Sequence, residues 1–300
     1  MKGISIIVPC YNCGKFIDEC IESILNFNIK NKYEIIVVDD CSKDETQNIL
    51  KKYENKKNVQ IYRNEENKGV QYSRNYGLKK AKFDYVMTID GDDKLNTKLS
   101  KRKKVYIDEA IDVLENNENI AFVQGIWQMF GDFSGYTITT YPVTEELIVH
   151  KHHVQTSIIH RRSDNVLYDE EIKKFQDWSF GVTLINKRYL EGKKNDIYFI
   201  EQPYYLYRIH NSKNRISTNN TISEYEMLKI TVRKNQDVFK KYFKKYDLET
   251  IYKKVYESIP NKFVSMLYVA NYSMKIAIKM KNERGYDDIK ATIEPPMFSC

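Results

Sequence analysis

The chain has 300 residues, of which 42% are hydrophobic, and its formal net charge is +7. This apolar content can bury a sizeable core, so the composition excludes a disordered chain and favours one large domain with an appendage, or two small domains. The five cysteines are odd in number and their spacing suits no disulfide framework, so we expect free thiols in a reducing compartment.

The first residues read as a strand and not as a signal peptide, because Met1 runs directly into the apolar segment Ile4–Val8 with one lysine and no cleavage site. No apolar run reaches the roughly 18 residues of a transmembrane helix. The nearest, Phe263–Met280, is interrupted by polar and charged residues. We therefore expect a soluble, cytoplasmic protein.

A β-α-β unit is predicted at the start of the chain. Ile4–Val8 and Tyr33–Val38 are apolar and rich in β-branched residues, and both are short enough for buried parallel strands. Between them, Phe16–Leu25 has apolar residues at helical spacing and acidic residues in its first turn. The unit is complete within about forty residues, which is the usual scale.

The alternation of strand and helix then repeats. Ser42 as N-cap with Glu45 three residues on fits a capping box. The pattern indicates a doubly wound, mostly parallel α/β sheet flanked by helices, in which ligands bind at the carboxyl ends of the strands. The further predicted elements are a helix over 42–53, a strand over 59–62, a helix over 70–81, a strand over 85–89, a helix around 105–114, a strand over 120–130 and an extended segment or strand pair over 197–207.

The C-terminal part is expected to be helical from Thr221 to Lys281, with a break at Pro260. Residues 221–290 hold 15 Lys and Arg against 9 Asp and Glu, so most of the positive charge lies there. Three interpretations stay open for these helices: a solvated face, a dimer interface, or contact with anionic lipid on the inner face of the cytoplasmic membrane.

Acidic residues follow two of the predicted strands. Asp90-Gly91-Asp92-Asp93 closes the strand over 85–89, and Gly91 permits a close backbone approach. Carboxylate oxygens are preferred ligands of Mg²⁺ and Mn²⁺, which in substrate sites are commonly shared with phosphates. The alternative is an ordinary polar turn.

Asp39-Asp40 ends the second strand, so both acidic groups should lie along the same edge of the sheet. Carboxylates there can accept hydrogen bonds from a base or a ribose hydroxyl, although one of the two could merely start a turn. The sequence contains no P-loop and no G-x-G-x-x-G, which disfavours a classical ATPase or dehydrogenase.

Other candidate sites are weaker. Cys10 and Cys13 form a C-x-x-C, but no second pair completes a zinc site. The histidines of 150–153 have no carboxylate or cysteine close by, and the basic run 101–104 lacks the interleaved aromatics of a nucleic-acid strip. We expect no nucleic-acid partner.

Five motifs, in order, resemble those of family 2 glycosyltransferases. The similarity is tight over residues 4–94 and looser to about residue 212. The motifs are Ser5-Ile6-Ile7-Val8-Pro9-Cys10-Tyr11-Asn12, Val37-Val38-Asp39-Asp40-Cys41-Ser42-Lys43-Asp44, Asn67-Lys68-Gly69-Val70, Ser73-Arg74-Asn75-Tyr76-Gly77-Leu78 and Asp90-Gly91-Asp92-Asp93.

This resemblance implies a GT-A type domain over residues 1–215, with a nucleotide-binding part at 1–95 and an acceptor part at 96–215, followed by a helical region at 216–300. It also implies an inverting transferase that uses Mn²⁺ or Mg²⁺ and moves a sugar, hexosyl or N-acetylhexosaminyl, from a nucleotide diphosphate, with a UDP-sugar expected. The implied acceptor is a hydroxyl of a glycan or lipid-linked glycan, as in the biosynthesis of cell-surface polysaccharides.

The resemblance also assigns roles to residues of the donor site. His210 lies in the segment Tyr207–Asn211, which is similar to a late family segment whose histidine can join the metal or diphosphate; Arg208 and Arg215 are candidates for phosphate contact. The implied donor and metal residues are Pro9 and Tyr11 in the first turn, Asp39 and Asp40 near the base, Arg74 near the phosphates, Asp90 near the ribose, Gly91 as a further donor-binding residue, and Asp92 with His210 on the metal.

Asp177 is the implied catalytic base, because Phe175-Gln176-Asp177-Trp178 fits the family's acidic motif before an aromatic residue. Gln176 departs from that motif, since an acid is common at its position. Glu170 and Glu171 are reserve candidates.

Two other functions remain as alternatives. A metal-dependent nucleotidyltransferase also uses carboxylates at strand ends, but it should have a Gly-rich, basic loop after the first strand, whereas residues 9–15 hold one Gly and one Lys. The second alternative is a non-catalytic nucleotide-binding or membrane-assembly module. It is favoured only by the basic tail and by the departure of Gln176 from the acidic motif.

Overall fold

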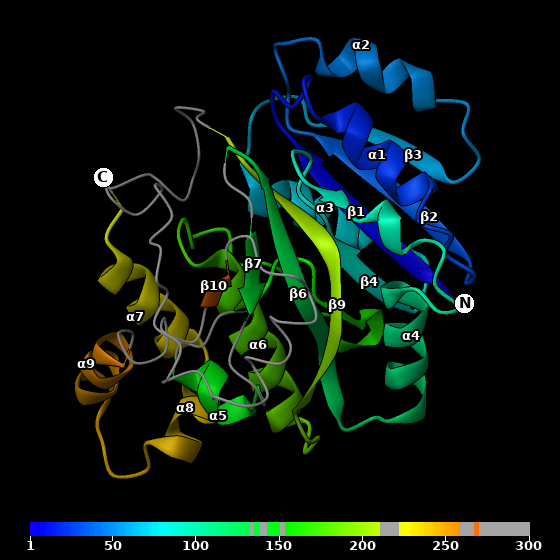
Figure 1. Ribbon diagram of the computed structural model, residues 1–300. Coiled ribbons are helices and arrows are strands. Elements are labelled where there is room, and N and C mark those ends of the chain that lie inside the picture. Colours follow the sequence, from blue (N-terminus) through cyan, green and yellow to red (C-terminus); the bar gives the residue numbers. More distant parts are fainter. Residues whose placement is uncertain (133–134, 139–142, 151–153, 211–221, 259–266, 270–300) are drawn as a thin grey trace.

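The computed structural model describes residues 1–132, 135–138, 143–150, 154–210, 222–258 and 267–269 (Figure 1). The strands are β1 Ile4–Cys10, β2 Tyr33–Asp39, β3 Val59–Arg63, β4 Tyr85–Thr88, β5 Lys94–Leu95, β6 Ile120–Gly131, β7 Gly135–Ile138, β8 Ile159–Arg161, β9 Asp196–Ile209 and β10 Leu267–Val269. The helices are α1 Ile17–Leu25, α2 Thr46–Leu50, α3 Val70–Lys80, α4 Tyr106–Asn116, α5 Glu145–Val149, α6 Gln176–Leu190, α7 Glu224–Lys234, α8 Gln236–Tyr242 and α9 Leu248–Glu257.

The described strands form one mixed sheet in the order β10-β7-β6-β8-β4-β1-β2-β3, which confirms the predicted α/β architecture. β1, β2, β3 and β4 are all parallel, as the repeated strand-helix pattern predicts. β8 pairs antiparallel with both β4 and β6, so the sheet changes direction there. β9 runs parallel to β6 and antiparallel to β5.

Both faces of the parallel strands are covered, which explains their continuous apolar sequences. In β1, Ile6 and Val8 pack into the core that includes residues of α1 and α4. Ile7 points to the opposite face, where α3 lies so close that a Cβ on Gly77 would be 2.5 Å from the Ile7 side chain. The carboxyl end of β1 is thus fixed between two layers of helix.

The segment predicted as a strand pair or extended chain over 197–207 is one long strand, β9. Its pairing with β6 has register shifts between Ile120 and Phe122 and between Gly125 and Trp127. Its last residues lie beside β5, which directly follows the acidic segment 90–93. β9 therefore brings residues near position 208 to the end of β4.

The helix predicted over 42–53 is wrong in its start. α2 begins at Thr46, and Ser42 is not its cap, because the Ser42 Oγ accepts a hydrogen bond from the Asn12 amide at 2.9 Å. Asp44 instead accepts from the Thr46 amide and from the Gly14 amide, both at 3.0 Å. The Ser42 and Asp44 side chains thus bind amides of the loop after β1. This contact takes the place of the helix cap predicted at Ser42.

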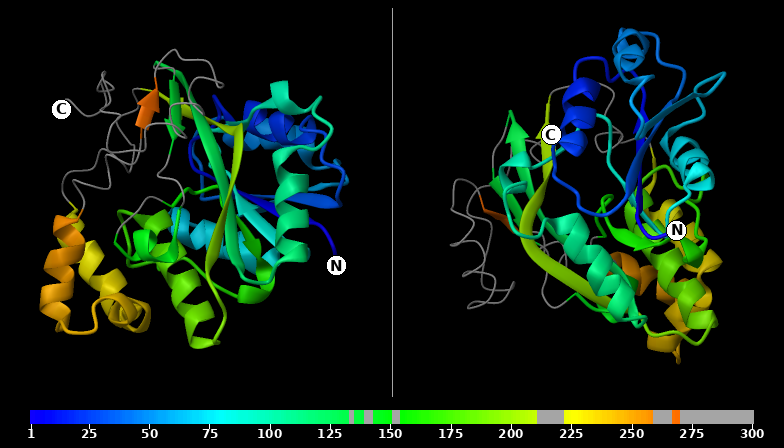
Figure 2. Two further views of the ribbon diagram at one scale, coloured as in Figure 1. Left: turned by 60° about the horizontal axis from the view of Figure 1, so that its bottom comes forward. Right: turned by 90° about the vertical axis from the view of Figure 1, so that its right-hand side faces the viewer.

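The helices α7–α9 fall within the segment predicted to be helical. They share a hydrophobic cluster with α5 and α6 and lie on the opposite side of the molecule from β1–β3 (Figures 1 and 2). Residues 267–269 form β10 against β7, where the sequence predicted helix; Pro260 lies outside the described residues. Within the described ranges, no helix is long and apolar enough to cross a membrane.

Candidate functional site

The predicted site residues gather at the carboxyl ends of β1, β2 and β4. The register pairs Cys10 with Asp39 and Ile7 with Thr88, so these three strands end close to one another. Just beyond the ends, Asn12 and Cys41 adopt left-handed backbone conformations, with φ of 51° and 63°. The chain turns sharply at both places, so it leaves the sheet directly after β1 and β2.

The segment after β4 presents two carboxylates to solvent and buries the third. The Asp90 and Asp92 side chains are 30% and 34% exposed. Asp93 accepts hydrogen bonds from the Tyr205 hydroxyl and the Arg208 amide, both at 2.7 Å, and burial beside the other two carboxylates raises the pKa of Asp93 well above its ordinary value. Asp93 is therefore a structural anchor of this segment.

Gly91 allows the segment to pass directly over the end of β1. Its amide donates to the Pro9 carbonyl at 3.2 Å, and a Cβ at this position would lie 2.9 Å from the Cβ of Cys10. The close backbone approach expected of Gly91 is thus an approach to the protein's own chain.

Arg74, on α3, lies at the centre of the site with 3% of its side chain exposed. Its guanidinium donates to Asp90 at 2.7 Å, to Asp177 at 3.2 Å and to the Thr156 hydroxyl at 2.8 Å. Burial opposes the charge, but Asp90, Tyr168 and Asp177 raise the pKa of Arg74 above its ordinary value. A permanent cation therefore holds the carboxylates of Asp90 and Asp177 on either side of itself.

Asp177 lies in the first turn of α6, and the residue before that helix, Phe175, is in the left-handed conformation with φ of 60°. The side chain of Asp177 is 27% exposed. Burial raises the pKa of Asp177 above its ordinary value, whereas Arg74 opposes the rise. A carboxylate with a raised pKa that is still open to solvent has the properties of a general base.

The reserve carboxylates are engaged elsewhere. Glu170 accepts from the Asn75 side chain at 3.0 Å, and Glu171 lies 3.0 Å from the Lys234 ammonium. Gln176, at the position where the family motif commonly has an acid, donates its side-chain amide to the Lys173 carbonyl at 3.3 Å.

Asp92 and His210 lie together, with 3.1 Å between Oδ2 and Nε2. The His210 ring also packs on Phe16, with centroids 5.0 Å apart. No group of three or more potential metal-ligating side chains occurs among the residues that the structure describes. One carboxylate oxygen and one imidazole nitrogen fit a Mn²⁺ or Mg²⁺ ion that takes its remaining ligands from phosphates and water.

Asp39 and Asp40 are buried, and both are engaged by the chain itself. Asp39 accepts from the Ser42 amide at 3.0 Å and pairs with Arg63. Asp40 accepts from the Asn64 side chain at 2.7 Å and from the amides of Lys68 and Gly69 at 2.9 and 2.7 Å. Both residues shape the loops around the strand ends.

The turn after β1 differs from Asp39 and Asp40 because it exposes a side chain to solvent. Pro9 is buried within β1, whereas the Tyr11 side chain is 42% exposed beyond its end. An exposed aromatic ring there can stack on a nucleotide base.

Two parts of the site could not be found from local sequence. Thr156 and Tyr168 touch Arg74 from positions 82 and 94 residues away, and no motif marks them.

Arg215 and residues 151–153 lie outside the described residues. His150 packs on Phe243, with ring centroids 4.7 Å apart.

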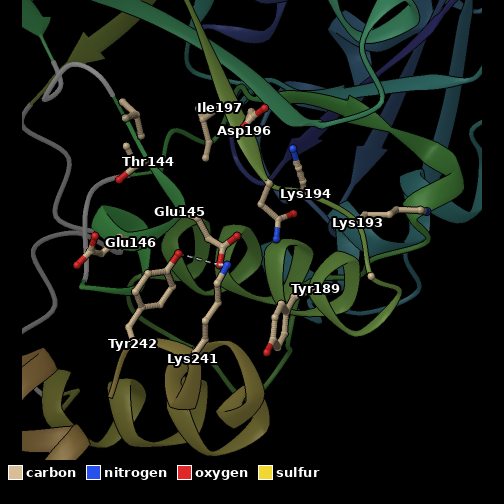
Figure 3. A pocket seen from close by; sticks show the side chains of 13 residues that line it. Thr144, Glu145, Glu146, Tyr189, Lys193, Lys194, Asp196, Ile197, Lys241 and Tyr242 are labelled. Atoms are coloured by element: carbon tan, nitrogen blue, oxygen red, sulfur yellow. Dashed lines mark hydrogen bonds and ion pairs between the residues drawn. The ribbon is translucent and has the colours of Figure 1, made fainter. Parts of the chain in front are cut away.

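A cavity of about 620 Å³ lies apart from this site, at the other end of α6. Figure 3 shows Tyr189, Lys194, Lys241 and Glu145 around it, and Lys241 contacts Glu145 at 2.7 Å. None of the predicted site residues lines the cavity.

Comparisons with known proteins agree with the predicted resemblance. Residues 5–143 match the family model described as glycosyl transferase family 2. The uncharacterized glycosyltransferase MJ1057 of Methanocaldococcus jannaschii is 31% identical over 229 residues, which cover 71% of this chain and 73% of that protein.

The poly(ribitol-phosphate) β-N-acetylglucosaminyltransferase TarS of Staphylococcus aureus is 40% identical over 111 residues. This match covers 36% of the chain but only 19% of the length of TarS. The crystal structure of TarS residues 1–349 in complex with UDP-GlcNAc is similar to this chain with a TM-score of 0.63 and 25% identity, covering 78% of this chain and 66% of that one.

Proposed function

Because this chain belongs to glycosyltransferase family 2, we propose that it transfers a hexosyl or N-acetylhexosaminyl group from a UDP-sugar to a hydroxyl of a glycan or lipid-linked glycan, with inversion. The observation that carries the proposal is the position of Arg74 between Asp90 and Asp177. Arg74 joins a carboxylate of the donor-side segment to Asp177, a carboxylate with the properties of a base. The similarity to a UDP-GlcNAc-bound structure supports the choice of donor.

The residues at the strand ends would bind the nucleotide. The exposed ring of Tyr11 can stack on the base, and the Asp90 side chain can accept from a ribose hydroxyl. Asp39 would act near the base chiefly by pairing with Arg63 at the end of β3, and Asp40 by holding the loop that carries Lys68.

Asp177 would remove the proton from the acceptor hydroxyl. As the acceptor oxygen bonds to the anomeric carbon, the bond from that carbon to the diphosphate oxygen breaks and its electron pair leaves with the diphosphate. A single displacement of this kind inverts the anomeric centre, unlike the double displacement of a retaining enzyme. Arg74 keeps the Asp177 carboxylate oriented between turnovers.

Asp92 and His210 would hold a divalent cation beside the diphosphate. Such a cation would neutralise the negative charge that develops on the departing group.

The role of Asp177 is tested by the substitution Asp177→Asn. We expect turnover to fall by at least about 100-fold, the usual contribution of a general base, with donor affinity retained. Initial rates with the donor give the turnover, and thermal shift with UDP gives the binding. Glu170→Gln and Glu171→Gln are the controls and should keep turnover; an active Asp177→Asn protein would remove Asp177 from the mechanism.

The donor is identified by thermal shift with UDP, GDP, CMP and dTDP and their sugar conjugates, with and without Mn²⁺. Ligands well above their Kd stabilise the fold by mass action. We expect the largest shift with a uridine diphosphate, dependent on the metal and lost in Asp92→Asn. A shift confined to another nucleotide would overturn the choice of donor.

A further inference from the structure

Arg208 holds the acidic segment 90–93 at two points, one on the main chain and one on a side chain. Its Nε donates to the Asp92 carbonyl at 2.7 Å, and its own amide donates to the Asp93 carboxylate at 2.7 Å. His210, two residues further on, contacts the Asp92 carboxylate at 3.1 Å. The end of β9 therefore contacts both the main-chain carbonyl and the side-chain carboxylate of Asp92.

The guanidinium of Arg208 packs on two aromatic rings. Its central carbon lies 4.6 Å from the centroid of Phe16 and 4.4 Å from that of Phe130. Phe16 is also the ring that packs on His210. A planar guanidinium stacks on aromatic faces while its N–H groups stay aligned, which an ammonium cannot do in the same way.

An acidic residue of α1 completes the cluster. Glu19 lies 3.1 Å from Arg208 and 2.6 Å from Lys94, and Lys94 in turn lies over Phe130. Only 12% of the Arg208 side chain is exposed. Residues of α1, β5, β6 and β9 thus combine to hold one guanidinium against the carbonyl of Asp92.

We propose that Arg208 is a positioning residue that aligns Asp92 and His210 for a divalent cation. This inference rests on the proposed function and replaces the phosphate contact that the sequence suggested for Arg208. Two of the five guanidinium N–H groups are committed to Asp92 and Glu19, so Arg208 is held by the protein's own chain. Groups that orient metal ligands in this way typically change metal affinity by about 10–100-fold when they are replaced.

The test is the binding of Mn²⁺ to the full chain without any donor, measured from the electron paramagnetic resonance signal of the free ion. The variant Arg208→Lys keeps the charge but loses the fork geometry, and we expect the concentration for half-saturation to rise roughly 10–100-fold. Arg162→Lys is the matched control, because the Arg162 Nε donates to the Phe83 carbonyl at the same 2.7 Å near the opposite ends of the strands. It should bind Mn²⁺ as the wild type does.

Glu19→Gln is a second variant, which loosens the cluster from its outer side and leaves the Asp92 carbonyl bond in place. It should weaken Mn²⁺ binding less than Arg208→Lys does, and circular dichroism checks that both variants are folded. Unchanged Mn²⁺ binding in Arg208→Lys, with weaker UDP binding, would overturn the inference in favour of a phosphate contact. A wild-type protein that binds UDP and transfers sugar without any divalent cation would instead refute the metal site itself, and this inference with it.

Discussion

The candidate base depends on contacts that single residues make with Asp177. Arg74 and Asp177 are 3.2 Å apart. The Thr156 hydroxyl contacts both residues: it accepts a hydrogen bond from Arg74, and it stabilises the ionised carboxylate of Asp177. Burial raises the pKa of Asp177, whereas Arg74 and Thr156 each lower it. The pH at which this carboxylate becomes a base is therefore set by a balance of opposing neighbours.

Replacing Thr156 by valine should shift that balance. Valine removes the hydrogen bond that favours the ionised form, so the pKa of Asp177 should rise further. Since a base acts only when it is deprotonated, the acidic limb of the pH profile of kcat/KM should move to higher pH. Thr231→Val is the control, because Thr231 is also buried but its hydroxyl bonds Ser179 and the Met227 carbonyl in place of Arg74. An unmoved acidic limb in Thr156→Val would mean that another group sets it.

At the scale of elements, α6 connects the site to the rest of the molecule. Asp177 is in its first turn, and Arg188, in its last turn, is 1% exposed. Arg188 pairs with Asp164 at 3.2 Å and donates to the carbonyls of Glu118 and Lys194 at 2.6 and 2.9 Å. One buried cation thus fixes the far end of the helix that carries the base.

Arg188→Met should destabilise the protein by about 3–5 kcal/mol, because it leaves the Asp164 carboxylate buried without its cation. Urea unfolding measures the loss. The double variant Asp164→Asn/Arg188→Met should recover part of it, since the uncompensated charge is then removed. A double variant no more stable than the single one would show that packing of the arginine, and not its charge, is what matters.

The sequence predicts the parallel strands and their helices well because each carries its own local pattern. Val70–Lys80 differs by one residue from its predicted end. Contacts between distant segments leave no such pattern: Ser42 bonds Asn12 in place of capping a helix, and Thr156 reaches Arg74 across the fold. The motifs predicted which side chains lie at the strand ends. They did not predict that the Asp39 and Asp40 carboxylates accept hydrogen bonds from backbone amides of the neighbouring loops.

At the scale of the whole molecule, a group of exposed lysines on the described C-terminal helices lies far from the site. Lys240, Lys244, Lys245 and Lys253 are exposed on α8, α9 and the turn between them, where Tyr246 is 46% exposed. α8 adjoins the C-terminal end of α6, since the Lys241 ammonium lies 5.3 Å from the ring of Tyr189. The length of α6 from Asp177 to Tyr189, about 18 Å, separates the base from this lysine face.

The lysine face should bind anionic membranes, which attract surface lysines by about 1 kcal/mol each. We expect the protein to sediment with vesicles that contain phosphatidylglycerol more than with neutral vesicles, and less at high salt because the charges are screened. Charge reversal in Lys244→Glu/Lys245→Glu should weaken binding by at least about 2 kcal/mol, or roughly 30-fold. Lys56→Glu/Lys57→Glu, at two exposed lysines in the loop before β3, changes the net charge equally and should have a smaller effect. If both double variants weaken vesicle binding alike, net charge alone governs the binding. The lysine face would then not be a dedicated docking surface, and an acceptor anchored in the membrane would reach Asp177 without one.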